Sequence, residues 1–253
     1  MIRVLRAEIF KLRTTRLILG LLLAATALVL LGVVAQLALQ NNAELRAQGA
    51  VVRVRTQEDL RLLLSANASI ALFTLVLGVT SMTGEHRYGT MASTFLAEPR
   101  RWRVVAGKLA ATALVGGAFG AVVAAVATVV AVAWLAISGG PVPFGRSVLL
   151  ALLLTPPATG LVASLGVVIG AAVRNQLAAI LAALGWVLVV ENLISAIVPW
   201  AGKWLPYTGA LGAIAGAGAS GELLHPWAGG LLLVGYVAAF GAVAVWIVER
   251  RDV

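Results

Sequence analysis

The chain has 253 residues, of which 61% are hydrophobic and 11% are charged, a balance that excludes a purely water-soluble domain because one core could not bury so much apolar surface. It contains no cysteine, which excludes disulfides, thiolate metal sites and cysteine nucleophiles. The net charge of +9 does not indicate a nucleic-acid partner, because the Lys and Arg residues stand at the ends of apolar segments.

The first predicted element is a short amphipathic helix over residues 2–13. Its apolar face consists of Ile2, Leu5, Ile9 and Leu12. The remainder carries the charged residues Arg3, Arg6, Glu8, Lys11 and Arg13. We expect this helix to lie on the inner membrane surface, with its basic face at anionic headgroups and its apolar face at the acyl boundary. It serves either as a plain anchor or as a contact for a cytosolic partner.

Six apolar stretches are long enough to cross the hydrocarbon layer, which needs roughly 20 residues of helix. They cover residues 17–39, 62–83, 109–137, 148–173, 177–198 and 228–248. The first is too long for the apolar region of a signal peptide, so we interpret it as a retained span. The sequence therefore predicts an all-α polytopic membrane protein with six transmembrane helices and one transmembrane domain over residues 1–253.

The distribution of basic residues predicts the orientation. With six spans both termini share one side, and thirteen of the nineteen Lys and Arg residues fall in the segments on that side. The positive-inside rule then places the N- and C-termini in the cytoplasm. Four arginines in the outer loop over residues 40–61 run against this orientation.

The inner loop after the second span is the most informative segment. It begins Gly84-Glu-His-Arg-Tyr-Gly-Thr90 and continues Met91-Ala-Ser-Thr-Phe-Leu96 before Pro99. A Gly-Thr helix start, an apolar pair of Met91 and Phe95 at i, i+4 spacing and a terminating proline predict a short surface helix. A loop that only sets topology would need nothing but its basic residues, so we interpret this helix as a docking surface for another protein.

Three features interrupt the later spans. Pro156 and Pro157 lie inside the fourth span, where their missing N–H donors should kink or break the helix. Glu191 is the one acidic residue placed within a span, where a carboxylate at the bilayer centre costs about 2.5 to 3.5 kcal/mol and should face protein or water. We weigh a pathway or dimer-interface role for Glu191 and Asn192 against simple solvation at the outer interface. Residues 199–227, rich in Trp, Gly and Ala, form either a re-entrant element or an outer loop.

Glycine spacings offer a weaker signal. Gly116 and Gly120, and also Gly166 and Gly170, are spaced as in helices that approach closely in membranes. Because the chain has 27 glycines, such spacings arise easily by chance.

Two segments resemble a known family. Glu85-His-Arg-Tyr-Gly-Thr90, followed by Pro99-Arg100 and Lys108, resembles the cytoplasmic signature of the ABC-2 type permeases of bacterial ATP-binding cassette (ABC) transporters. Arg6-Ala-Glu8-Ile-Phe-Lys11-Leu-Arg13 resembles the N-terminus of that family. The resemblance implies a connecting helix at residues 2–13 and a coupling helix near 90–97 that both touch a separate ATPase subunit. The residues it implies for docking are Glu85, His86, Arg87, Gly89, Thr90, Met91, Phe95, Pro99 and Arg100.

The same resemblance implies partners and activity. It implies a multi-pass permease in the bacterial plasma membrane that pairs with a second permease, identical or paralogous, and exports an amphiphilic small molecule, drug, peptide or lipid. The ATP and Mg²⁺ would be bound by the partner subunit and no cofactor by this chain. It also implies a re-entrant outer element before the last span.

Missing motifs narrow the alternatives. The sequence has no G-x-x-x-x-G-K-[ST] phosphate loop, so this chain cannot itself be the ATPase, and it has no H-E-x-x-H or G-x-S-x-G motif. We therefore expect neither an enzyme nor a metal site. The remaining alternatives are a secondary transporter driven by an ion gradient, which would use broken helices and polar groups near the midplane, and a non-transporting membrane scaffold or immunity protein.

Overall fold

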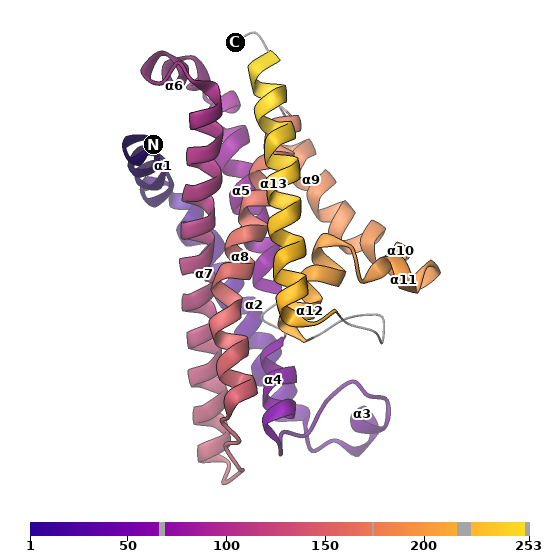
Figure 1. Ribbon diagram of the computed structural model, residues 1–253. Coiled ribbons are helices and arrows are strands. Elements are labelled where there is room, and N and C mark those ends of the chain that lie inside the picture. The colour runs from indigo at the N-terminus through magenta and orange to yellow at the C-terminus, as the bar shows by residue number, and fades with distance from the viewer. Residues whose placement is uncertain (66–68, 174, 217–223, 251–253) are drawn as a thin grey trace.

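The computed structural model describes residues 1–65, 69–173, 175–216 and 224–250, and every regular element in these ranges is helical, so the predicted all-α class is confirmed (Figure 1). The long helices are α2 (Arg16–Leu39), α5 (Ile70–Arg87), α7 (Arg101–Ile137), α8 (Arg146–Ala172) and α13 (Pro226–Arg250). The short helices of the N-terminal half are α1 (Ile2–Thr14), α3 (Ala43–Ala47), α4 (Gln57–Ser65) and α6 (Met91–Ala97). Between α8 and α13 lie α9 (Gln176–Gly185), the π-helical turn η2 (Trp186–Val190), α10 (Glu191–Ile197), α11 (Pro199–Gly202), the π-helical turn η3 (Pro206–Leu211) and α12 (Gly212–Ala215).

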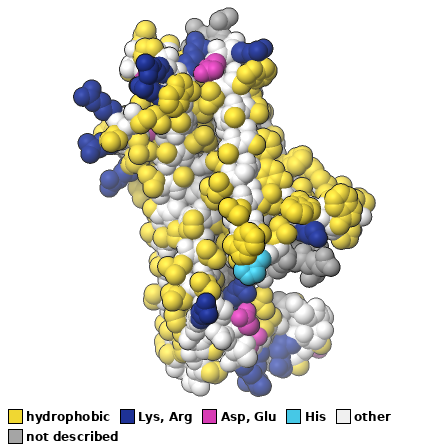
Figure 2. All heavy atoms as spheres, viewed as in Figure 1, with side chains coloured by type: hydrophobic (Ala, Val, Ile, Leu, Met, Phe, Trp, Pro, Cys, Tyr) yellow, Lys and Arg dark blue, Asp and Glu magenta, His cyan; other side chains and the backbone are white. Residues whose placement is uncertain are grey.

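Five helical segments of the described residues are long and apolar enough to cross a membrane. They are Arg16–Leu39, Arg101–Ile137, Arg146–Ala172, Gln176–Ile197 and Pro226–Arg250. These segments match the first, third, fourth, fifth and sixth predicted spans. In Figure 2 hydrophobic side chains cover the middle of the molecule, and most Lys and Arg side chains gather toward its two ends. This is the architecture of a multi-pass membrane protein.

The predicted second span over residues 62–83 is not one described helix. Helix α4 ends at Ser65 and α5 begins at Ile70, while residues 66–68 lie outside the described ranges. Helix α5 also ends in charged and polar residues, and eleven of its 18 residues are buried. Since other helices rather than lipid surround α5, its composition departs from that of a lipid-facing span. A sixth span therefore stays a prediction.

Glycines let three helices approach closely. A Cβ atom on Gly78 of α5 or on Gly160 of α8 would overlap a backbone carbonyl of the facing helix, that of Ala163 in the first case. A Cβ on Gly116 of α7 would lie 2.6 Å from the Cβ of Ala163, and one on Gly170 would lie 2.8 Å from a backbone oxygen of α5. The glycine spacings that the sequence offers as a weak signal do mark helix contacts here.

The two prolines do not break α8, which is one helix from Arg146 to Ala172, so of the predicted kink or break the break is wrong and the kink stays a prediction. Just beyond them, the Thr159 hydroxyl donates a hydrogen bond to the carbonyl oxygen of Gly116 in α7 at 3.1 Å. A Cβ on Gly117 would lie 3.0 Å from the Pro156 carbonyl oxygen. Contacts with α7 thus support α8 where its own hydrogen bonds are missing.

Helix α7 is longer than a membrane is thick. Its 37 residues extend about 55 Å at 1.5 Å per residue, against about 30 Å of hydrocarbon. One end of α7 meets α1, α6 and the last turns of α13 (Figure 1). Residues 176–202, which we call the arm, diverge from the bundle on the side of α13. The arm exposes large hydrophobic side chains, Trp200 among them at 70% exposure.

Candidate functional site

Helix α1 packs on protein along the face that the sequence predicts to be apolar. Leu12 is buried together with Leu77 of α5, and Leu5 and Ile9 pack partly against the same cluster. Gly107 of α7 provides room, because a Cβ there would lie 2.6 Å from a methyl carbon of Val4. The expectation that this face lies at the acyl boundary is therefore wrong for Leu5, Ile9 and Leu12, which α7 and α5 cover, whereas Ile2 at the start of the face is 69% exposed.

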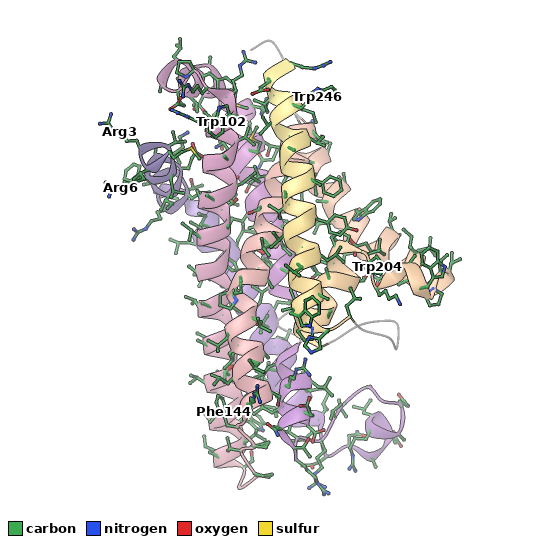
Figure 3. All side chains as sticks on the ribbon, in the orientation of Figure 1. Arg3, Arg6, Trp102, Phe144, Trp204 and Trp246 are labelled. Carbon is green, nitrogen blue, oxygen red and sulfur yellow. The ribbon has the colours of Figure 1, made fainter. Side chains whose placement is uncertain are left out.

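The charged residues of α1 divide between two directions. Arg3 and Arg6 point away from the bundle (Figure 3), and Arg13 is exposed as well. Glu8 points inward and is 3% exposed, which is unusual for an unpaired carboxylate. This inward face of α1 leads to the main polar site of the molecule.

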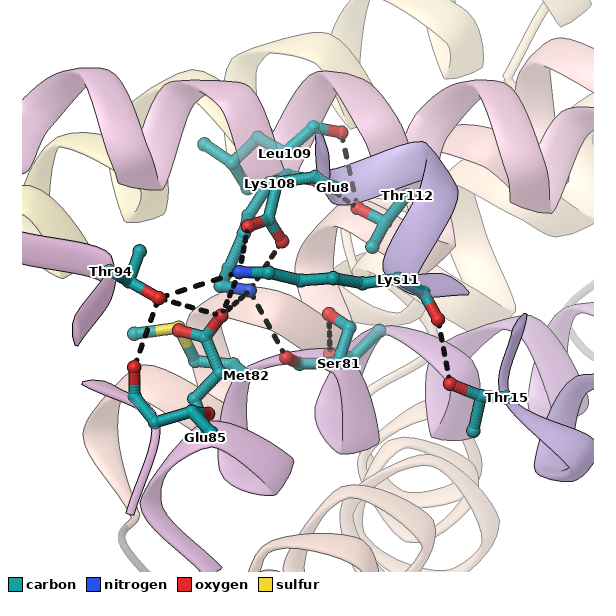
Figure 4. A network of polar contacts seen from close by, with 12 residues as sticks. Glu8, Lys11, Thr15, Ser81, Met82, Glu85, Thr94, Lys108, Leu109 and Thr112 are labelled. Carbon is teal, nitrogen blue, oxygen red and sulfur yellow. Dashed lines mark hydrogen bonds and ion pairs between the residues drawn. The ribbon is translucent and has the colours of Figure 1, made fainter. Parts of the chain in front are cut away.

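Four charged residues meet there, and we call Glu8, Lys11, Glu85 and Lys108 the charge cluster (Figure 4). The Lys108 Nζ lies 2.5 Å from Glu8 Oε2 and 3.0 Å from Glu85 Oε1. The Lys11 Nζ lies 2.7 Å from Glu8 Oε1 and 2.7 Å from Glu85 Oε1. Two cations and two carboxylates alternate around one centre, so the charge cluster has no net charge when all four are ionised.

Because three side chains of the charge cluster are buried, each of them needs an oppositely charged partner. The side chains of Lys108, Glu8 and Glu85 are 2%, 4% and 7% exposed, whereas that of Lys11 is 44% exposed. An ion taken out of water loses several kcal/mol of hydration, which only close partners can offset. Any change that leaves one of the three buried charges unpaired must therefore be strongly unfavourable.

The charge cluster joins four helices. Glu8 and Lys11 come from α1, Glu85 from the end of α5 and Lys108 from the second turn of α7. The hydroxyl of Thr94 in α6 accepts a weak hydrogen bond from Lys11 at 3.4 Å. Lys108 also donates to the carbonyl oxygen of Ser81 at 3.3 Å. Glu85 Oε2 is buried and has no hydrogen-bond partner among the described residues.

The electrostatics of the charge cluster favour its ionised form. Burial alone would raise the pKa of Glu85, but Lys108 and Lys11 outweigh burial and hold the pKa below its ordinary value. Burial would also lower the pKa of Lys11, but hydrogen bonds to Glu8 and Glu85 raise it above its ordinary value. Both residues lie outside the apolar stretches.

These directions predict how stability depends on pH. A carboxylate with a lowered pKa stabilises the fold above its ordinary pKa and loses that contribution as the pH falls through the lowered value. A lysine with a raised pKa contributes below its ordinary pKa and loses that contribution as the pH rises through the raised value. We expect the melting temperature of the purified protein to be nearly constant from about pH 5 to 10 and to fall on either side. In Glu85→Gln the acidic fall should be weaker, and an unchanged acidic fall would contradict the assignment.

The predicted docking residues differ in how far they are exposed. Glu85 is buried in the charge cluster, so it cannot itself touch a docked protein, and His86 is half-buried. The exposed members of the predicted set are Arg87, Gly89, Thr90, Pro99 and Arg100. The sequence did not single out Ser81 or Thr94, and no pattern along the chain marks them as neighbours of Lys108.

Met91 and Phe95 face the bundle rather than the outside. Met91 is 6% exposed and shares an apolar cluster with Met82 and Val248, against which Phe95 packs. They form one face of α6, as their spacing predicts, but not the outward one. The outward apolar side chains at this end are Leu96, which is 85% exposed, and Tyr88, which is 74% exposed.

Arg101 holds the start of α7 against two other helices. Its guanidinium donates a hydrogen bond to the carbonyl oxygen of Val248 in α13 at 2.9 Å. The same group lies 5.1 Å from the centroid of the Phe95 ring in α6, within reach of a cation–π interaction. Helices α6, α7 and α13 are thus connected beside the charge cluster.

Glu191 lies elsewhere and is not solvated. It is 0% exposed, so the alternative that it simply meets water at the outer interface is wrong. Its Oε2 accepts hydrogen bonds from the backbone N–H groups of Thr208 at 2.7 Å and Tyr207 at 3.0 Å. Its Oε1 accepts one from the indole of Trp186 at 3.0 Å. Asn192 is exposed and donates to the backbone of η2.

This carboxylate therefore caps η3, one turn of the predicted re-entrant segment. The first N–H groups of a helix lack intrahelical acceptors, and an anion there is stabilised by their dipoles. Residues 217–223 of that segment lie outside the described ranges. No group of three or more His, Asp or Glu side chains in the described part of the chain could hold a metal ion.

The chain was also compared with known proteins. It matches no protein-family model, and no characterised protein sequence matches it.

Proposed function

We propose that this chain is the transmembrane permease subunit of an ABC transporter that exports an amphiphilic small molecule, drug, peptide or lipid. The ATP is hydrolysed by a separate subunit that docks at the end of the bundle carrying α1 and α6. Six spans, cytoplasmic termini, a bacterial plasma membrane location and pairing with a second permease belong to this proposal.

The charge cluster is the main observation in favour of this proposal. A permease driven by a separate motor needs an element that receives the motor's movement and a firm connection from that element to the spans. Helices α1 and α6 protrude at one end, and the charge cluster ties both of them to α5 and α7. Since the Lys108 link is buried and short, a displacement of α1 would be passed to α5 and α7 rather than absorbed by loose side chains. A displacement of α6 would be passed on through the packing of Met91 and Phe95 against the bundle.

The exposed surface around the charge cluster suits docking. Leu96 and Tyr88 offer apolar contact area on and beside α6, and Arg87 and Arg100 lie exposed near them. Arg3 and Arg6 face away from the bundle on α1 and Arg13 is exposed there, so anionic headgroups of the inner leaflet would meet these side chains. This arrangement separates a membrane-facing side of α1 from its cluster-facing side.

A gradient-driven secondary transporter is the second candidate. The observation in its favour is Glu191, a fully buried carboxylate beside a π-helical turn of a predicted span. Broken helices with such groups near the midplane are typical of that class. The two candidates differ in one measurable respect, because only the ABC permease requires a partner that hydrolyses ATP.

Leu96→Asp should weaken binding of the proposed ATPase subunit. We expect the affinity to fall roughly 30-fold, the effect of losing a side chain that contributes about 2 kcal/mol to an interface. The measurement is retention of the purified ATPase on immobilised chain, followed by the rate of ATP hydrolysis of the reconstituted complex.

Ile137→Asp is the matched control. Ile137 is 87% exposed, as Leu96 is, but it lies at the opposite end of α7. The control should bind the ATPase as the unchanged chain does, and both variants should keep the melting temperature. Equal retention of the ATPase by both variants would contradict docking at α6, and a chain that transports its substrate without any ATPase would support the second candidate.

A further inference from the structure

A cavity of about 620 Å³ lies between α13, α8 and the arm. Cavities of roughly 300 to 1,000 Å³ hold drug-sized ligands. Its wall is almost wholly hydrophobic, with side chains from α5, α8, α9, η2, η3 and α13. In the view of Figure 3, Trp204, which follows the arm, lies to the side of α13 near this region.

Two kinds of side chain distinguish this cavity from a plain apolar groove. Four aromatic rings line it, those of Trp186, Tyr207, Tyr236 and Phe240. The rings of Tyr236 and Phe240 stack with centroids 5.6 Å apart, and the Tyr236 hydroxyl donates to the backbone oxygen of Trp204, just beyond the arm, at 2.8 Å, which holds that ring in place. Glu191 is the one acidic side chain among the described residues that line it.

The carboxylate of Glu191 is held by hydrogen bonds, and none of its partners among the described residues is a cation. All the donors that its carboxylate meets among the described residues are backbone N–H groups, a hydroxyl and an indole. No Lys, Arg or His contributes to the described lining of the cavity. Neutral donors stabilise a carboxylate but leave its full negative charge, and a low-dielectric wall screens that charge little.

We infer that this cavity binds a lipophilic organic cation, with its charge toward Glu191 and the rings and its apolar body against α8 and α13. Aromatic faces attract cations, and the attraction grows when water is excluded. The carboxylate adds a Coulomb attraction that neither an acyl chain nor a neutral amphiphile would gain. Binding itself needs no ATPase, so only the statement that this cation is the exported cargo rests on the proposed function.

Three probes of similar aromatic character test the charge requirement. They are tetraphenylphosphonium, which is cationic, tetraphenylborate, which is an anion of nearly the same shape, and neutral triphenylphosphine oxide. Each is equilibrated by dialysis with the full chain in lipid nanodiscs, and the amount taken up by empty nanodiscs is subtracted. We expect saturable binding of tetraphenylphosphonium with one site per chain and no saturable binding of the borate.

Two variants act on the cavity in different ways. Glu191→Gln removes the charge and keeps the size, and should weaken phosphonium binding roughly tenfold or more while leaving the neutral probe unaffected. Val243→Trp leaves Glu191 intact and fills the cavity from α13, whose Val243 lines it, and should abolish binding of the phosphonium. Glu58→Gln, which removes an exposed carboxylate of α4 away from the cavity, is the matched control and should bind normally.

The possible outcomes test the binding site and the proposed function separately. Loss of phosphonium binding in both cavity variants, with normal binding in the control, supports the site even if Glu191→Gln alone disturbs the cap of η3. Binding that both variants leave unchanged, or equal saturable binding of all three probes, overturns it. If the chain binds the phosphonium but the complex with its ATPase neither transports it nor hydrolyses ATP faster, the site stands and the cargo assignment fails.

Discussion

Lys108→Met should lower the free energy of unfolding by about 3 to 5 kcal/mol, the largest effect we expect from any single side chain of the charge cluster. The variant leaves Glu8 and Glu85 with Lys11 as their one cation, so a negative charge stays buried without compensation. For a chain of this size, the change corresponds to a fall in melting temperature of about 10 °C. Size-exclusion chromatography after heating of the detergent-solubilised protein measures it.

Two variants show whether pairing rather than packing is responsible. Arg6→Met removes an exposed cation of α1 and should change stability by less than about 0.5 kcal/mol. Glu8→Met combined with Lys108→Met removes one charge of each sign and leaves Lys11 and Glu85 paired at 2.7 Å. The double variant should regain most of the lost stability, because replacing a whole buried pair by apolar side chains is often neutral. A double variant less stable than Lys108→Met would contradict the cluster.

Gly78→Ala should be nearly as damaging, at about 3 kcal/mol, although it adds one methyl group. That methyl would overlap the backbone carbonyl of Ala163 in α8, and a backbone atom cannot rotate away as a side chain can. Helices α5 and α8 would have to separate along the closest contact in the bundle, an overpacking cost near the upper end of the usual range. The expected readouts are lower yield of folded protein and a lower melting temperature.

Gly84→Ala is the control on the same helix. Nothing lies within 4 Å of a Cβ at this position. Because alanine restricts the unfolded chain and favours helix, the change should be neutral or stabilising by about 0.5 to 1 kcal/mol. If Gly78→Ala and Gly84→Ala shifted the melting temperature in the same direction, the close approach of α5 and α8 would be contradicted.

The spans were the most predictable part of the fold. Hydropathy over some 20 residues reports directly on whether a helix can face lipid, and α2, α8 and α13 follow the predicted limits within two residues. Helix α5 shows the limit of hydropathy as a predictor of helices in a membrane protein. A helix surrounded by other helices is not required to be apolar throughout, so its sequence contains the polar and charged residues that pair inside the bundle.

Individual residues of the candidate site could be predicted from the sequence, but their arrangement could not. Glu8, Lys11 and Glu85 stood out individually, but their meeting with Lys108 depends on how α1 folds back onto α7. The spacing of Met91 and Phe95 correctly predicted one shared face of α6, yet spacing cannot show whether a face turns inward or outward. For Glu191, its position in a predicted span required either protein or water around it, and its partners are backbone N–H groups of η3 that no sequence pattern reveals.

The distance along the chain between the partners of the charge cluster has a consequence for biosynthesis. Glu8 and Lys108 are 100 residues apart, and ribosomes add about 5 to 20 residues per second. During the roughly 5 to 20 seconds that separate them, the nascent α1 first has only its internal Glu8–Lys11 pair. Glu85, 74 residues after Lys11, becomes available next, and Lys108 at the start of α7 comes last. Once Lys108 has been made, its ion pair with Glu8 can hold α1 against the bundle. A docked α1 therefore indicates that α5 and α7 have been inserted in the correct order.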